Sequence, residues 1–182
     1  CFCGQASRNG LCREHQQALK LDGLISLFSY ADPLIRELLH SLKYRSHADV
    51  AEFLRLHFRQ QFLQSLPKGS WVVTAVPVSR AKQADRGFNQ SALIAKALTE
   101  PMFEFRQLLE KTKDTAAQVK LNKNQRLTNL LGSFKVSTSS VLPEQVVVVD
   151  DVITTGSTLK EAAKVLKRAG VQRVWGLTIC HG

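Results

Sequence analysis

The sequence predicts an α/β fold, a mainly parallel β-sheet flanked by helices, and two observations support this. From Leu24 to the end of the chain, short apolar runs alternate with amphipathic segments, the order typical of βαβ units. One run, VVVV at 146–149, has no polar position, as expected of a central parallel strand covered on both faces. A chain of 182 residues can form one such domain with a small appendage.

The expected elements follow in order along the chain. Runs rich in β-branched and aromatic residues predict strands, and apolar residues spaced three and four apart predict helices. Leu34 and Phe53 are among the apolar residues expected on buried helix faces, and Gly170 is expected to end the last helix. The predicted strands cover 24–30, 71–78, 102–109, 145–151 and 171–180, and the predicted helices cover 33–44, 47–65, 88–99, 124–131 and 155–170, with a loop over 111–126.

Composition narrows the class of protein. No apolar run approaches the roughly 20 residues that cross a bilayer, so no membrane span is expected. Lys and Arg number 25 against 15 Asp and Glu, a net charge of +10, which favours nucleic acid or phosphorylated metabolites as partners. A basic protein without such a partner is the alternative. The sequence begins at Cys1 rather than Met and shows no secretory signal, so we expect a trimmed, cytoplasmic chain.

An acidic pair ends the apolar run in the segment VVVVDDVITTGSTL (146–159). Ligands of open α/β sheets bind beyond the carboxyl ends of the strands, which is where we expect Asp150 and Asp151. Successive strand residues point to opposite sides, so these carboxylates are not both expected to cap the next helix. Two neighbouring carboxylates can accept hydrogen bonds from both hydroxyls of a vicinal diol and can attract a metal cation.

Small polar residues follow the acids directly. Their hydroxyls and backbone N–H groups precede a predicted helix, whose N-terminus favours phosphate, and Gly156 lets the backbone approach a ligand. A diol beside a phosphate indicates ribose 5-phosphate. Taken singly, Asp151 or Thr155 could be a helix N-cap and the segment an ordinary turn; the Walker pattern is absent. The predicted phosphate-binding residues are Thr154, Thr155, Gly156, Ser157 and Thr158.

The segment VVVVDDVITTGSTL resembles the phosphoribosyl pyrophosphate (PRPP) signature of type I phosphoribosyltransferases. The stretches VPVSRAKQADRGFNQSALIAKAL (76–98) and QVKLNKNQRLTNLLGSF (118–134), together with LKYR (42–45), are similar to the ComF family of competence proteins and GntX-like proteins. This resemblance covers nearly the whole chain. It implies a type I phosphoribosyltransferase fold with PRPP as a ligand.

The resemblance also implies roles for particular residues. Asp150 and Asp151 would hold the ribose hydroxyls and approach the Mg²⁺ that accompanies PRPP, while Arg86 and the 111–123 loop would close over the pyrophosphate. In phosphoribosyl transfer, pyrophosphate leaves C1 of the sugar and gains negative charge, which cations stabilise. Lys113 is a further candidate, although each such cation could equally be solvated surface charge. The pyrophosphate would also meet Val78, Ser79, Arg80 and Lys82.

Residues 1–20 are polar and cysteine-rich and are expected to form an appendage to a domain over 21–182. Two short motifs, C-x-C and C-x-x-H, offer four soft ligands that suit tetrahedral zinc, and ComF relatives often carry an N-terminal cysteine knuckle. The C-x-C spacing is tighter than the usual C-x-x-C, and a frayed terminus with reduced thiols is the alternative. The predicted zinc ligands are Cys1, Cys3, Cys12 and His15.

Three functional hypotheses remain open at this point. The resemblance implies an accessory protein of DNA uptake in natural transformation that binds PRPP and contacts single-stranded DNA and the uptake machinery. The alternatives are an active phosphoribosyltransferase of nucleotide salvage and a PRPP sensor without chemistry. The residues give no signature for an acceptor base, so PRPP binding is common to all three hypotheses.

Overall fold

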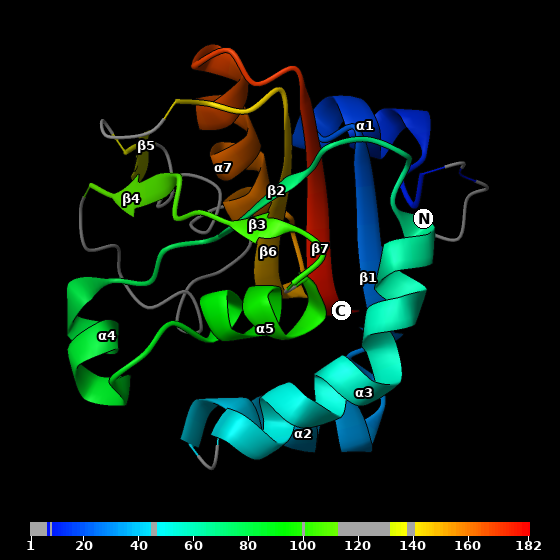
Figure 1. Ribbon diagram of the computed structural model, residues 1–182, viewed down its shortest axis with the longest axis vertical. Helices are drawn as coiled ribbons and strands as arrows, with labels where there is room; N and C mark the ends of the chain where they lie inside the picture. Colours follow the sequence, from blue (N-terminus) through cyan, green and yellow to red (C-terminus); the bar gives the residue numbers. More distant parts are fainter. Residues whose placement is uncertain (1–6, 8, 45–46, 100, 113–131, 138–140) are drawn as a thin grey trace.

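The structure, a computed structural model, describes residues 7, 9–44, 47–99, 101–112, 132–137 and 141–182. Its centre is a five-stranded sheet in which each neighbouring pair is parallel (Figure 1). The predicted α/β class and the parallel sheet are therefore confirmed. In spatial order the strands are β1 (Gly23–Ser29), β7 (Arg173–His181), β6 (Gln145–Ile153), β2 (Val72–Ala75) and β3 (Glu104–Phe105).

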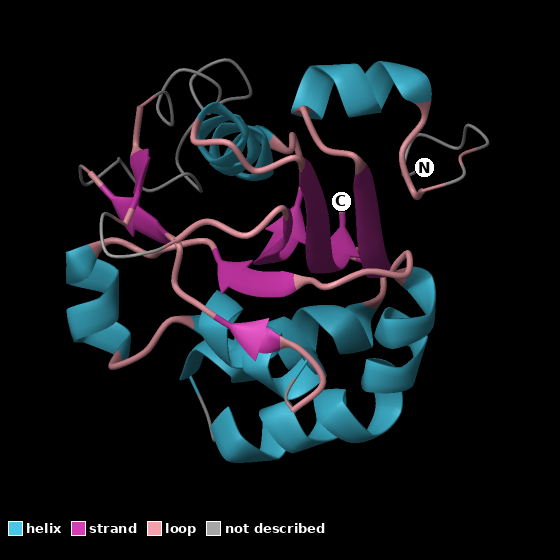
Figure 2. Cartoon of the chain, turned by 45° about the horizontal axis from the view of Figure 1, so that its top comes forward, coloured by secondary structure: helices cyan, strands magenta, loops and turns pink. Residues whose placement is uncertain are grey.

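Helices cover both faces of the sheet, as the view in Figure 2 shows. In the part of the chain that the structure describes, three helices contribute side chains to the core on one face and two to the core on the other, while a short helix lies to one side of the sheet (Figure 1). Among the described residues, no helix has the length and apolarity that a bilayer crossing requires. The three helices are α2 (Pro33–Tyr44), α3 (His47–Ser65) and α5 (Gln90–Thr99), the two are α1 (Arg13–Leu19) and α7 (Ser157–Arg168), and the short one is α4 (Arg80–Arg86).

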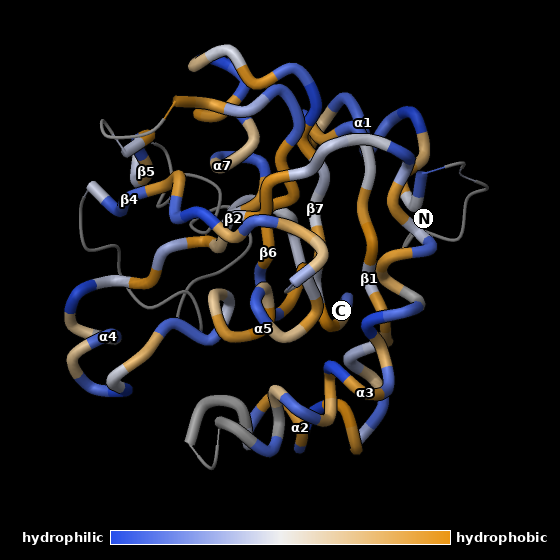
Figure 3. The backbone as a smooth tube through the Cα atoms, in the orientation of Figure 1, coloured by the Kyte–Doolittle hydropathy of each residue, from blue (hydrophilic) through white to orange (hydrophobic). Residues whose placement is uncertain are grey.

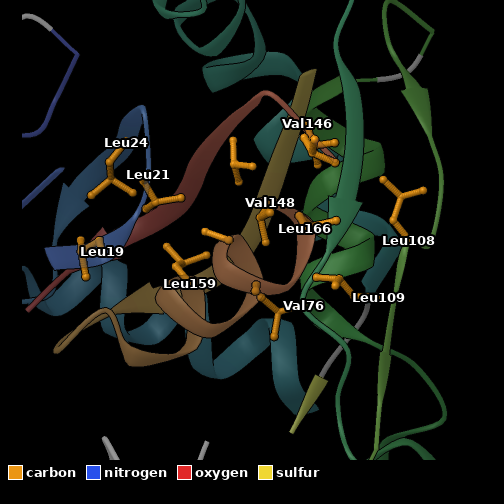
Figure 4. Packing of buried hydrophobic residues seen from close by; sticks show 14 of the residues in the cluster. Leu19, Leu21, Leu24, Val76, Leu108, Leu109, Val146, Val148, Leu159 and Leu166 are labelled. Carbon is orange, nitrogen blue, oxygen red and sulfur yellow. The ribbon is translucent and has the colours of Figure 1, made fainter. Parts of the chain in front are cut away.

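The valines of β6 divide between two hydrophobic clusters because alternate strand residues face opposite sides. Val147 and Val149 pack in the cluster that includes side chains of α3 and α5. Val146 and Val148 pack in the cluster that includes α7 (Figure 4), where they lie near Leu166. All four valines are fully buried, each worth about 1.5–3 kcal/mol of transfer free energy. The strand that carries the acids is thus packed in the core on both faces of the sheet. Figure 3 shows by colour that strand β1 is apolar and that helix α4 is more polar.

A small two-stranded antiparallel sheet lies beside the main sheet and consists of β4 (Leu109–Lys111) and β5 (Phe134–Val136). The single strand predicted over 102–109 is wrong in extent, because β3 belongs to the main sheet and β4 to this smaller one. The chain leaves the main sheet after Arg106, whose N–H donates to Val73 O at 2.9 Å. The strand β5 and the helix α4 were not predicted. The predicted 124–131 helix and the 111–126 loop beyond Thr112 lie outside the described residues.

Two predictions of buried side chains are wrong. Leu34 and Phe53 are 73% and 41% exposed, whereas Ile35 and Leu39 of α2 are 8% and 3% exposed. The buried stripe of α2 is therefore narrower than the apolar pattern suggested, since a shift of one residue turns a helical side chain by about 100°. Cys180, in contrast, is fully buried.

The described part of the cysteine-rich segment packs against the rest of the fold. Helix α1 was not predicted, and Leu11 and Leu19, 4% exposed each, belong to the same cluster as Leu159 and Leu166 of α7. A domain boundary at residue 20 remains a prediction, but the side chains on either side of it share one core.

Candidate functional site

The acidic pair lies in the second half of β6, and both residues are half-buried. The strand continues past the pair to Ile153, two residues further than the predicted end. Asp150 Oδ1 accepts a hydrogen bond from the N–H of Asp151 at 2.9 Å. Asp151 Oδ1 in turn accepts one from the N–H of Val152, also at 2.9 Å. Each carboxylate therefore lies beside the backbone of the next residue, near the carboxyl edge of the sheet where ligands of α/β folds bind.

The environment of Asp150 opposes its ionisation. Burial is the main cause that raises the pKa of Asp150 well above its ordinary value, and the charge of Asp151 raises it further. Hydrogen bonds from the Asp151 N–H and from Ser91 act in the opposite direction. Two adjacent carboxylates at a partly dry strand end repel one another. A ligand that brings hydroxyl donors or a cation would relieve this repulsion.

The hydroxyl-rich segment connects β6 to α7 at the same edge. Thr154 is exposed and Thr155 is half-buried, and Thr155 Oγ1 lies 3.0 Å from Ser157 Oγ, at the first residue of α7. Thr158 is half-buried. The segment thus places exposed and half-buried threonine hydroxyls at the N-terminus of a 12-residue helix, while Ser157 is buried. The helix dipole and the first N–H groups there favour an anion.

Gly156 is required here for a different reason from the one the sequence suggested. Its φ of +71° is in the left-handed region, which strains residues with a Cβ. A Cβ at this position would lie 2.5 Å from Leu19 Cδ2. The side on which Gly156 has no side chain therefore faces α1 and not open ligand space.

The residues predicted to meet pyrophosphate follow the end of β2, the strand next to β6. The N–H of Val76 still donates to Val149 O at 2.9 Å, so the two strand ends remain side by side. The turn then places Val78 half-buried and Ser79 at 7% exposure before Arg80, which is exposed, begins α4. The backbone of Lys82 is in α4, and its side chain is outside the described part.

Arg86 is the last residue of α4 and is half-buried. Its Nη1 donates to Gln90 Oε1 at 3.1 Å, which ties the end of α4 to the start of α5. In a parallel sheet, the carboxyl ends of neighbouring strands share one edge, so β2 and β6 bring two of the predicted ligand segments together there.

Comparisons with known proteins agree with this geometry. Residues 84–181 match the family model for the phosphoribosyl transferase domain. Competence protein ComFC of Bacillus subtilis is 30% identical over 177 residues, which cover 93% of this chain and 71% of that protein. This chain belongs to the ComF family. DNA utilization protein YhgH of Escherichia coli is 32% identical over 170 residues (87% of this chain, 71% of the relative). Competence protein F of Haemophilus influenzae is 36% identical over 111 residues (58% and 48%).

As a ComF family member, the chain has the type I phosphoribosyltransferase fold that the resemblance implied. Gln118, Arg126 and Asn129, which belong to a stretch that carried the resemblance, lie outside the described residues, as do the candidate cation Lys113 and most of the 111–123 loop. The described residues on either side of 113–131 are hydrogen-bonded: Thr112 Oγ1 donates to Gly132 O at 2.7 Å, and the Gly132 N–H donates to Glu161 Oε1 of α7 at 2.8 Å.

The zinc prediction concerns two residues inside the described part and two outside it. Cys12 is 5% exposed, and its Sγ lies 3.0 Å from Nδ1 of His15, so this half of the predicted ligand set is adjacent. Cys1 and Cys3 are not described. Within the described ranges, no group of three or more His, Cys, Asp or Glu residues is placed to hold a metal ion. Zinc binding stays a prediction.

Two residues of the site, Asn89 and Ser91, were not predicted as functional. They lie in and next to the RGFNQ stretch that served only as a family signature. Asn89 Nδ2 donates to Val76 O at 2.9 Å, and Ser91 Oγ donates to Asp150 Oδ1 at 3.3 Å. The bonded residues are 13 apart in the first case and 59 apart in the second, so the hydrophobic periodicity of the sequence does not reveal these contacts.

A cavity of about 480 Å³ lies between α3 and α5, and Asn89 is one of its lining residues. The others include Glu52 and Arg55 of α3 and Lys96 of α5, which are exposed. Arg55 already pairs with Glu52, and Lys96 lies over the ring of Phe105. The acids and the hydroxyl-rich segment do not line this cavity, and Asn89 is the residue that it shares with the site described above.

Proposed function

We propose that this ComF family member binds PRPP together with Mg²⁺ at the carboxyl edge of β6. The observation that carries the proposal is the position of the acidic pair directly before the hydroxyl-rich N-terminus of α7. The carboxylates accept the ribose hydroxyls, and the Thr154–Thr158 segment donates hydrogen bonds to the 5-phosphate. Mg²⁺ supplies positive charge to the pyrophosphate oxygens.

The residues after β2 serve the other end of the ligand. The turn of Val78 and Ser79 lies at the strand end next to the acids, and Arg80 and Arg86 begin and end α4. Their guanidinium groups stabilise the charge on the pyrophosphate through hydrogen bonds, which are strong when donor and acceptor are both charged.

The direct test is calorimetric titration of the protein with PRPP, with and without Mg²⁺. We expect Mg²⁺-dependent binding by the wild type and at least a tenfold loss in the Asp150→Asn, Asp151→Asn double variant, equivalent to about 1.4 kcal/mol or more. A matched control is Asp85→Asn, an exposed acid of α4, which we expect to bind PRPP with unchanged or slightly increased affinity. Equal affinity in the wild type and the double variant would contradict the proposal.

We further propose that the protein acts in DNA uptake and contacts single-stranded DNA in the cytoplasm. The names of its relatives, a competence protein and a DNA utilization protein, and the net charge of +10 support this. Contacts between cations and DNA phosphates release counterions, so the binding constant should fall steeply with salt. Filter binding of an unstructured oligonucleotide between 50 and 200 mM salt tests it, and a salt-independent affinity would contradict it.

Transferase activity is the second candidate, and the match to the phosphoribosyl transferase domain over 84–181 favours it. Its test is release of pyrophosphate from PRPP with a panel of bases and amines, compared between the wild type and Asp151→Asn. Release that depends on an acceptor and is lost in the variant would establish turnover. Binding of PRPP without release, and without affinity for DNA, would identify a sensor.

A further inference from the structure

The side chain of Asn89 connects the start of α5 to the end of β2. Its Oδ1 accepts a hydrogen bond from the N–H of Ser91 at 3.0 Å, the usual bond of an N-cap residue. Its Nδ2 donates to Val76 O at 2.9 Å. The cap needs only an acceptor, and many side chains can provide one. The second bond needs an amide, because the same side chain must also donate.

Ser91 continues this connection from α5 to β6. It is 1% exposed, and its Oγ donates to Asp150 Oδ1 at 3.3 Å. The same Oδ1 accepts the N–H of Asp151 at 2.9 Å, so Ser91 fixes the carboxylate next to the second acid. Thr178, the partner of Asp150 on β7, has no hydrogen-bond partner for its buried hydroxyl among the described residues. The side-chain hydroxyl that reaches Asp150 comes from α5.

These bonds form one chain from Val76 through Asn89 and Ser91 to Asp150. One end, Val76, lies two residues before the turn that the proposed function assigns to the pyrophosphate, and the other end, Asp150, is one of the acids that it assigns to the ribose. The backbone of β2 and β6 joins these segments only as far as the bond between Val76 N and Val149 O. The relative position of the pyrophosphate segment and the acids therefore depends on the hydrogen bond from Asn89 Nδ2 to Val76 O, which is not a backbone bond of the sheet.

We infer that Asn89 and Ser91 are positioning residues for PRPP, Asn89 by holding the segment after β2 at a fixed distance from the acids and Ser91 by orienting the Asp150 carboxylate. This inference rests on the proposed function, because PRPP is the ligand that spans both segments. Residues that hold ligand-binding groups in place commonly affect affinity by 10- to 100-fold at metal sites, and a ligand that contacts two segments is sensitive to their spacing.

Asn89→Ser is the sharpest variant for the first residue. Serine keeps the N-cap but has no amide to donate to Val76 O. We expect it to weaken binding of PRPP with Mg²⁺ about tenfold while changing the affinities for ribose 5-phosphate and for inorganic pyrophosphate, measured separately, by less than about twofold. Thr99→Val, which removes a buried hydroxyl at the other end of α5, is the matched control and should leave all three affinities unchanged.

Ser91 is tested by a double-mutant cycle with Asp150. We expect Ser91→Ala to weaken PRPP binding about fivefold in the wild type and less than twofold in the Asp150→Asn background, and Ser91→Thr to restore part of the loss. A purely structural role would weaken binding equally in both backgrounds.

The outcomes separate this inference from the proposed function. Two results with a wild type that binds PRPP would overturn the inference about Asn89 and leave the proposed function standing. One is an unchanged affinity of Asn89→Ser for PRPP; the other is a loss of affinity for ribose 5-phosphate and for pyrophosphate as large as the loss for PRPP. An equal effect of Ser91→Ala in both backgrounds overturns the inference about Ser91. If the wild type binds neither PRPP nor ribose 5-phosphate, the proposed function and the inference both fail.

Discussion

The carboxyl ends of β6 and β2 are neighbours in the sheet, yet they are held in different ways. The end of β6 pairs with β7 up to Ile153 and His181, and Gly182 N donates to Ile153 O at 3.0 Å. In the described residues, β2 pairs with β3 only at its first two residues, Val72 and Val73, so its end pairs with β6 on one side alone. Beyond β2 the chain enters α4, in which most described side chains are exposed.

This difference suggests a division of labour within the ligand site. The segment after β6 follows a strand that pairs with β7 up to its last residue, and Leu19 of α1 leaves no room for a side chain at Gly156. The segment after β2 is held by isolated hydrogen bonds such as the one from Asn89 Nδ2 to Val76 O. We expect substitutions on the β6 side to affect folding and binding together, and those on the β2 side to affect binding alone.

The largest expected effect comes from replacing a glycine on the β6 side and comparing it with the same replacement on the β2 side. Gly156 and Gly87 have φ values of +71° and +78°, but a Cβ would meet Leu19 at Gly156 and nothing within 4 Å at Gly87. Backbone strain alone costs about 1–2 kcal/mol, and overpacking adds about 1–3 kcal/mol. Urea unfolding should therefore show a loss of about 3 kcal/mol for Gly156→Ala and about 1 kcal/mol for Gly87→Ala.

Leu19→Ala provides the control for that pair. In its background, Gly156→Ala should cost less than it does in the wild type, because the space that the new methyl group needs is then open. An equal cost in both backgrounds, or an equal cost at the two glycines, would show that α1 does not constrain the phosphate segment.

The pH dependence of stability tests the acidic pair. Burial and the charge of Asp151 raise the pKa of Asp150 in the folded protein well above the ordinary value of 3.8. Between the ordinary pKa of this carboxyl and its raised pKa in the folded protein, the unfolded chain loses the proton first as the pH rises. The folded state then binds more protons than the unfolded state, so the stability of the fold falls. Asp150→Asn cannot ionise and should escape this fall.

Thermal unfolding of the wild type and Asp150→Asn from pH 4 to pH 8 measures the effect. The variant should gain stability relative to the wild type as the pH rises, and its affinity for PRPP should be lower than that of the wild type. A difference in stability that does not change with pH would mean that Asp150 ionises as easily in the folded state as in the unfolded chain.

Arg80→Ala should have the smallest effect on stability. Arg80 is exposed at the start of α4, and surface substitutions usually change stability by less than about 0.5 kcal/mol. We expect weaker binding of pyrophosphate and of PRPP, by roughly threefold to tenfold, with unchanged affinity for ribose 5-phosphate. Calorimetry with the three ligands distinguishes this from a general loss of the site, which would weaken ribose 5-phosphate as well.

Much of the fold follows from hydrophobic periodicity. The run of valines and the amphipathic segment after it predicted β6 and α7 to within two residues, because both are long and buried. Helices α1 and α4 were missed because REHQQAL and RAKQADR have too few large apolar residues for a stripe. The three-residue strand β5 is too short to show a period.

The site was predictable only in part, for a similar reason. The acids and hydroxyls are adjacent in sequence, so their chemistry can be interpreted without coordinates. The contact of Ser91 with Asp150 spans 59 residues and depends on how α5 packs on the sheet. The contact of Gly156 with Leu19 likewise depends on a helix that the sequence did not predict.

A sugar lacking one hydroxyl offers the most direct test of whether this edge of the sheet recognises a diol. Calorimetric titrations would compare ribose 5-phosphate with 2-deoxyribose 5-phosphate, both in the presence of Mg²⁺. If Asp150 and Asp151 accept both ribose hydroxyls, the deoxy sugar should bind at least tenfold more weakly, a difference of about 1.4 kcal/mol, and the double Asn variant should no longer distinguish the two sugars. Equal affinities of the wild type for both sugars would contradict the account.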